Sequence, residues 1–190
     1  MKLLGVIFFL CLGFSYCHQS SQNETIAANK VDSIENFFPV TSFIKGELAG
    51  MNRDGNTPIA YYTLNGRKDS SWVKPAEFND VFGPFLQPQI DSVNMNSLFT
   101  ETKFLDQTLN TFTFTYSPIK KLPVNMALQR WDVYLDANTN NVQRIYWLKF
   151  AGDTTQQLTW NAGENAKIIS VLPVNGKDSI VSETFITWRY

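Results

Sequence analysis

The clearest alternation of apolar and polar positions lies between Ala127 and Phe150, where two alternating runs flank an Asn-rich segment. This pattern predicts a β-hairpin. If its turn is centred on Thr139-Asn140, Trp131 lies opposite Leu148 and one face carries most of the apolar side chains. A loop with an odd number of residues would instead shift one strand by a residue and exchange the two faces on that strand.

The opposite face of this hairpin is mostly polar, yet the even-loop register places Tyr134, Ile145 and Trp147 together on it. Large exposed apolar patches are uncommon on monomeric proteins. Either another element covers these three side chains, or they form a contact surface. We keep them as the candidate interaction surface.

Two helices are predicted in the N-terminal half. Apolar residues fall at helical spacing from Pro39 to Met51, behind a proline that suits a helix start. A second helix starts at Pro75, and its apolar stripe ends where prolines follow at positions 84 and 88. That stripe consists of Phe78, Val81, Phe82 and Phe85. Such stripes usually cover a sheet, and the alternative is a ligand pocket lined by the phenylalanines. The spacing of apolar residues in 91–110 allows a third helix.

The other apolar runs predict strands. Asn65-Gly66 is a strong turn signal between 59–64 and 67–73, which form a first hairpin. Residues 111–116 alternate phenylalanine or tyrosine with threonine, as in a half-buried strand. Further runs lie at 157–160, 167–172 and 180–188. The prediction is an α+β fold: an antiparallel meander of about five to six strands with two or three N-terminal helices on one face.

The N-terminus has the features of an export signal. One lysine precedes an apolar run from Leu3 to Phe14, which is short for a membrane span but typical of a signal peptide. Residues 1–16 are therefore predicted to be removed. Cys17 follows directly, and a polar stretch comes after it, as in a bacterial lipoprotein whose cysteine is acylated. The other cysteine, Cys11, lies within the signal, so acylation gives the single remaining thiol a role.

The remaining chain has the size of one domain. Residues 17–36 are polar and predict a lipid-anchored flexible tether, and 37–190 predict a single α+β domain. Sixteen Lys and Arg balance 17 Asp and Glu, with no long run of either sign. A nucleic-acid partner would need a basic patch, so none is expected. The expected attachment to the membrane is through the N-terminal lipid alone.

The residues available for chemistry are few. His18 is the only histidine, which argues against a Ser-His-Asp triad and an ordinary zinc site. Phosphate-binding glycine motifs are absent from the sequence. Four acidic residues could supply paired carboxylates, and 136–140 resembles the start of a calcium loop but fits a hairpin turn better. The four are Glu101, Asp106, Asp132 and Asp136. We expect no catalytic residues, no cofactor and no metal.

Several segments resemble small uncharacterised lipoproteins of Bacteroidota. They are the signal ending in Cys17 with its polar tether, and the motifs FFPVTSFIKGEL, KDSSWVK, FLDQTLNTFTFTY and WDVYLD…VQRIYWLKF. The resemblance covers most of the chain after the signal and carries no activity. It implies attachment to the outer membrane, with the periplasmic or the outer side left open.

Three functional hypotheses follow. The leading one is an exported, lipid-anchored, non-enzymatic envelope protein that binds another envelope component, a protein or a glycan. The second is a carrier of a small apolar ligand that uses an aromatic-lined sheet face. The third is a carboxylate-dependent hydrolase, which requires at least two acidic side chains in one cleft.

Overall fold

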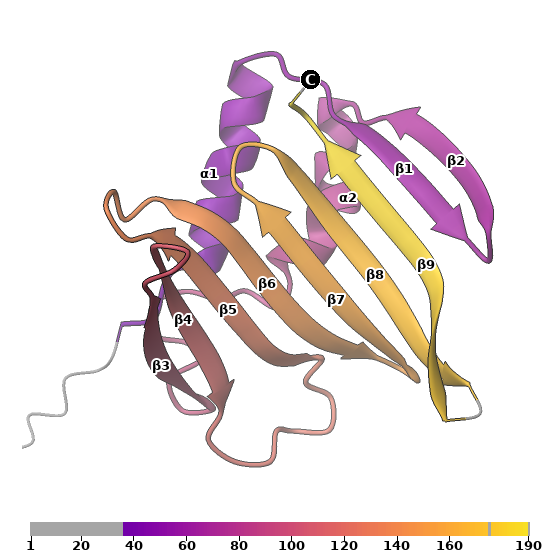
Figure 1. The fold of residues 1–190 in the computed structure, drawn as a ribbon. Helices are drawn as coiled ribbons and strands as arrows, with labels where there is room; N and C mark the ends of the chain where they lie inside the picture. The colour runs from indigo at the N-terminus through magenta and orange to yellow at the C-terminus, as the bar shows by residue number, and fades with distance from the viewer. Residues whose placement is uncertain (1–35, 175, 190) are drawn as a thin grey trace, which may run out of the picture. The chain divides into compact units, whose positions relative to one another are not determined.

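A computed structural model describes residues 36–174 and 176–189. The predicted signal peptide, Cys17 and nearly all of the predicted tether lie outside these residues. The described elements, in chain order (Figure 1), are α1 (Val40–Arg53), β1 (Ile59–Leu64), β2 (Arg67–Trp72), the 3₁₀ turn η1 (Pro75–Glu77), α2 (Phe78–Leu86), β3 (Phe99–Asp106), β4 (Thr111–Pro118), β5 (Leu128–Asp136), β6 (Val142–Ala151), β7 (Thr154–Asn161), β8 (Asn165–Val174) and β9 (Lys177–Thr187).

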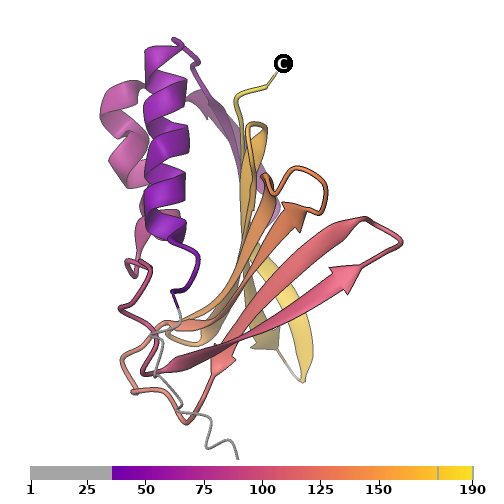
Figure 2. The ribbon, with the colours of Figure 1, turned by 90° about the vertical axis from the view of Figure 1, so that its left-hand side faces the viewer.

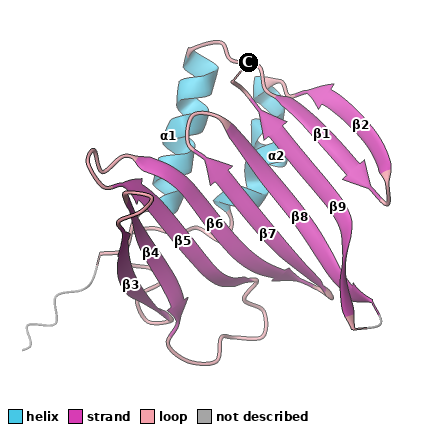
Figure 3. Cartoon of the chain, viewed as in Figure 1, coloured by secondary structure: helices cyan, strands magenta, loops and turns pink. Residues whose placement is uncertain are grey.

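The strands form one antiparallel sheet in the order β2-β1-β9-β8-β7-β6-β5-β4-β3 (Figure 3). From β3 to β9 each strand pairs with the next one in the chain, which is a meander. The first hairpin joins this meander at its far side, where β1 pairs with β9. The final strand of the chain is therefore an interior strand of the sheet.

Both helices cover the same face of the sheet (Figure 2). The inward stripe of α1 includes Val40, Ile44 and Leu48, and α2 contributes the phenylalanines of its predicted stripe. Beneath the helices, one row of neighbouring residues crosses six strands with every side chain fully buried. The row is Val133, Ile145, Trp160, Ala166, Ile186 and Ala60. The α+β class and the helices on one face are confirmed.

The sheet has nine strands, more than the five or six predicted. One reason is the first hairpin, which adds β1 and β2 to the sheet. Its Asn65-Gly66 turn forms as predicted, with φ of 48° and 80°. Both angles are positive, as a tight two-residue turn between twisted strands requires.

The second reason is that 91–110 does not form a third helix: Phe99–Asp106 is the edge strand β3. Its apolar residues fit both periods, but β3 pairs along its full length with β4. Asp106 then closes the hairpin by accepting hydrogen bonds from the following backbone amides, and Asn110 takes a positive φ of 50°. Asparagine and aspartate favour such turns because their side chains bond nearby backbone.

The hairpin of β5 and β6 has the odd-loop register, so the even-loop pairing is wrong. Trp131 lies opposite Trp147, and Val133 lies opposite Ile145. Residues 137–141 form the loop, which is held by the Asp136 carboxylate as it accepts hydrogen bonds from two backbone amides. From Arg144 to Lys149, the shift moves the β6 side chains to the face opposite the one expected, whereas Val142 pairs with Leu135 across a register irregularity.

Candidate functional site

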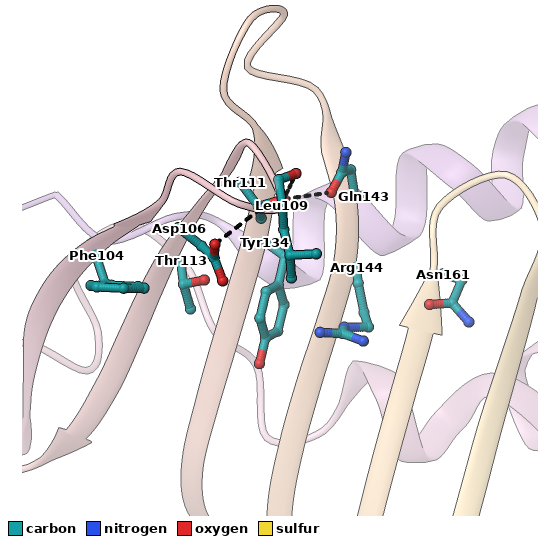
Figure 4. A pocket seen from close by; sticks show the side chains of 9 residues that line it. All are labelled: Phe104, Asp106, Leu109, Thr111, Thr113, Tyr134, Gln143, Arg144 and Asn161. Atoms are coloured by element: carbon teal, nitrogen blue, oxygen red, sulfur yellow. Dashed lines mark hydrogen bonds between the residues drawn. The ribbon is translucent and has the colours of Figure 1, made fainter.

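The face of the sheet without helices carries a pocket at the end where β3 turns into β4. Five of its residues are successive cross-strand neighbours: Phe104, Thr113, Tyr134, Arg144 and Asn161. The pocket has a volume of about 390 Å³ (Figure 4). Its complete lining is Phe104, Asp106, Leu109, Thr111, Thr113, Tyr134, Gln143, Arg144 and Asn161. We call this the hairpin pocket.

The centre of the hairpin pocket is a cation–π pair. The guanidinium carbon of Arg144 lies 4.1 Å from the centroid of the Tyr134 ring. The two residues face each other across β5 and β6, so the register of this hairpin brings them together. The contact restrains a long side chain that would otherwise move freely in water. The guanidinium nitrogens provide donors in a planar fork.

The wall of the hairpin pocket is held by turn hydrogen bonds. The Asp106 carboxylate accepts from the amides of Thr108 and Leu109 at 2.9 and 3.0 Å. The Thr111 hydroxyl lies 3.1 Å from the Leu109 carbonyl oxygen and 3.3 Å from Gln143 Oε1. These bonds tie the β3–β4 turn to β6. At the rim, Phe104 and Leu109 are 65% and 71% exposed. The pocket is thus preformed, with apolar groups facing water.

Beside the pocket, the next row of the same face holds a buried carboxylate. Asp132 is 1% exposed. Its Oδ1 accepts from the Thr115 hydroxyl at 2.6 Å and from Arg130 nitrogens at 3.0 and 3.2 Å. Burial, and then the charge of Asp132, raise the pKa of the neighbouring Tyr146 phenol. These hydrogen bonds and the ion pair with Arg130 satisfy the Asp132 carboxylate. A buried charge needs such partners to offset its loss of hydration.

The four acidic residues considered for catalysis have different partners. Asp132 pairs with Arg130, whereas Glu101 lies on the helix-covered face and pairs with Lys103 at 3.0 Å. Asp106 and Asp136 each cap their own turn. Hydrogen bonds from the Thr139 and Asn138 amides lower the pKa of Asp136. Each carboxylate therefore has a structural task in the fold.

Residues 136–140 act as a turn. The Asp136 oxygens accept hydrogen bonds from the backbone and from the side chains of Thr139 and Gln143. Within 36–174 and 176–189, the His, Cys, Asp and Glu side chains form no cluster of three or more that could hold a metal ion.

The three residues of the candidate interaction surface do not share a face. Ile145 and Trp147 are buried beneath the helices, and the Trp147 ring lies 5.6 Å from that of Phe85. Tyr134 lies on the other face, in the hairpin pocket. Sequence reasoning missed Phe104, Arg144 and Asn161 as its neighbours. The odd-loop register would have found Arg144, because it places an arginine opposite a tyrosine.

A buried lysine lies on the helix-covered face. Lys149 is 4% exposed, and its ammonium donates hydrogen bonds to the carbonyl oxygens of Pro84 and Gln87 at the end of α2. Burial lowers its pKa to about 8. The last carbonyls of a helix lack partners within the helix, so Lys149 satisfies groups that burial would otherwise orphan.

No helix in the described part of the chain is both long and apolar enough to cross a membrane. In comparison with known proteins, no family model, no curated protein and no solved structure matches the chain.

Proposed function

We propose that this chain is an exported, lipid-anchored, non-enzymatic envelope protein that binds a saccharide component of the envelope in the hairpin pocket. The observation that carries the proposal is the pocket itself. It combines two aromatic rings, a restrained guanidinium, hydroxyls and amides in one preformed hollow of about 390 Å³. Sites of this kind use few polar groups to orient a ligand against an apolar wall.

A saccharide has the matching chemistry. One face of a sugar ring presents C–H groups, which pack well on an aromatic ring, and its edge presents hydroxyls that both donate and accept. Phe104, at 65% exposure, offers a ring at the rim. Gln143 already bonds Thr111 and Asp136, and the Asn161 amide nitrogen donates to Asn165. The lining still offers the Thr113 hydroxyl and the carbonyl oxygen of the Asn161 side chain as acceptors, and Arg144 offers donors only. A purely apolar ligand would cover the Thr113 hydroxyl and the Arg144 guanidinium without offering either a hydrogen bond, at a cost in binding free energy.

The packing of the helix-covered face does not favour an apolar carrier. A carrier needs its aromatic wall to face an open cavity. Here Phe85 lies 5.6 Å from Trp147 and 5.4 Å from Trp160, and Phe82 lies 5.6 Å from Trp160. The rings of α2 thus occupy the space that an apolar ligand would need.

The anchor part of the proposal rests on the N-terminal sequence. Residues 1–16 have the features of a signal, and Cys17 is followed by a polar stretch. The Cys17→Ser variant should move from the membrane fraction to the soluble fraction of cells. Mass spectrometry of the native protein should show an acylated N-terminal cysteine. A variant that stays membrane-bound, with no acyl mass in the native protein, would contradict the anchor.

The binding part is tested with purified Cys17→Ser chain and a panel of soluble envelope oligosaccharides, by isothermal titration calorimetry. For a saccharide that binds, Phe104→Ala and Arg144→Ala should each weaken affinity about tenfold, the equivalent of about 1.4 kcal/mol. Tyr61→Ala and Arg67→Ala are the matched controls, because both residues are exposed and lie outside the pocket lining. Equal losses in the controls, or no binding across the panel, would contradict the proposal.

A further inference from the structure

The loop between β4 and β5, residues 119–127, is an exposed apolar segment at the end of the sheet opposite the hairpin pocket. Val124 is fully exposed, and Ile119 is 57% exposed. Phe150 of β6, 50% exposed, joins the loop through a hydrogen bond from its amide to the Ala127 carbonyl. Val124 and Phe150 border a hollow of about 500 Å³ that Leu122 and Met126 also line. Figure 1 shows this loop below the sheet, whereas the β3–β4 turn lies at the other end of β4.

The same loop is cationic. Lys120 and Lys121 are exposed and adjoin the apolar positions. The sequence from 117 to 131 contains no acidic residue. Apolar side chains next to lysines match the boundary of a lipid leaflet that carries anionic headgroups. A neutral or cationic partner would not use the two lysines.

The described chain also begins at this end of the sheet. The Phe38 amide donates to the hydroxyl of Tyr116, close to the end of β4. From there α1 extends towards the opposite end of the sheet. At that end its Glu47 carboxylate accepts a hydrogen bond from the Gly163 amide in the β7–β8 turn. Residues 18–35 separate the described chain from Cys17. A segment of that length spans at most about 65 Å when extended, which keeps the domain near any membrane that holds Cys17.

We propose that the β4–β5 loop docks on an anionic lipid surface, with Val124 and Ile119 among the lipid chains and Lys120 and Lys121 at the headgroup phosphates. The loop supplies a second contact in addition to the acyl anchor. Its geometry orients the domain, because the hairpin pocket then faces away from the membrane. The inference rests on the proposed anchor only for the loop's role as a second membrane contact, and it does not depend on saccharide binding.

The test uses purified Cys17→Ser chain from which residues 1–16 have been removed, so that it lacks both the acyl group and the apolar signal, and sedimentation with vesicles. One set of vesicles contains phosphatidylglycerol and phosphatidylethanolamine, and the other contains phosphatidylcholine alone. The chain should bind the anionic vesicles and not the zwitterionic ones. The double variant Lys120→Gln/Lys121→Gln should bind roughly 10- to 30-fold more weakly, and Val124→Asp should also lose most of the binding.

Two matched controls keep the result specific to the loop. Lys45→Gln/Lys74→Gln makes the same change in charge at exposed positions elsewhere, and Leu109→Asp makes the same kind of change at the other end of β4. Both should bind like the parent. Absence of vesicle binding, equal binding to both vesicle types, or equal losses in the controls would overturn the inference. Loop variants should keep any saccharide affinity, which separates this result from that of the proposed function.

Discussion

On β5, Trp131 and Val133 point towards the helices and are fully buried, while Asp132 and Tyr134 point to the opposite face. The first pair packs among apolar rings and aliphatic groups. The second pair contacts Arg130, Arg144 and a threonine. The same strand therefore contributes to two surfaces with different chemistry. Burial of rings stabilises one face, and the other face carries the groups of the proposed saccharide site. Stability and the proposed binding should therefore respond to different substitutions.

The largest effect should come from the helix-covered face. Trp160→Ala removes a fully buried ring that contacts Phe82, Phe85 and Trp188. We expect a loss of about 3–5 kcal/mol in the free energy of unfolding, measured by urea denaturation. Trp72→Ala is the control, since this residue is 59% exposed on the edge strand β2, and it should cost less than about 1 kcal/mol. Similar losses of unfolding free energy in both variants would contradict the expectation that the helix-covered face contributes more to stability.

Lys149 tests a buried charge on the helix-covered face. Its folded-state pKa is lowered to about 8 from 10.5. Between these values the unfolded state holds more protons than the folded state, so this residue makes stability rise with pH. From pH 7.5 to 10, the wild type should gain about 2 kcal/mol relative to Lys149→Met. Urea unfolding of both proteins at the two pH values measures the difference. An equal change in unfolding free energy between the two pH values in both proteins would show that burial does not destabilise the ammonium.

Asp132 tests whether the open face also contributes to stability. Asp132→Ala leaves the Thr115 hydroxyl and the Arg130 guanidinium without their shared acceptor. The expected loss is about 1–2 kcal/mol by thermal or urea denaturation, smaller than for Trp160, because Arg130 can turn to water. Asp153→Ala, at an exposed turn position, should change stability by less than about 0.5 kcal/mol. A loss as large as that of Trp160→Ala would mean that both faces stabilise the fold equally.

The smallest effect on stability is expected at Arg144. Arg144→Gln removes the cation–π contact with Tyr134, worth about 0.5–1 kcal/mol at an exposed site. Urea denaturation measures this change, with Arg67→Gln as the exposed control. The result sharpens the comparison because the same position should matter more for saccharide affinity than for folding. A loss above 2 kcal/mol, on the order of a core substitution, would assign Arg144 to the core instead.

Local patterns were sufficient for much of the fold. The helical stripe of α1 and the Asn65-Gly66 turn were predicted close to their observed bounds because helical spacing and turn chemistry are encoded by neighbouring residues. The alternation in 111–116 likewise gave β4. The edge strand β3 was missed because its apolar residues fit two periods and its pairing with β4 decides between them.

The site could not be predicted for a different reason. One residue of loop length decides whether Arg144 or Ile145 lies on the same face as Tyr134, and the Asn-rich segment permits both lengths. The pocket also needs Phe104 and Asn161, which the sheet brings beside Tyr134 from distant parts of the chain. Neighbouring residues could not indicate the burial of Lys149, because the carbonyl oxygens that accept its hydrogen bonds lie at the end of α2, 62 and 65 residues away.

The place of β9 inside the sheet sets the order in which the chain can fold. β1 pairs with β9, so the first hairpin has no partner until the last strand has been made. A chain that crosses a membrane N-terminus first cannot complete this sheet while its C-terminus is still being threaded. Closing that long loop also costs more entropy than adding consecutive strands, so docking of β1 should be a late step. Truncation before Lys177 would leave β1 and β8 with open edges, prone to pairing with other chains.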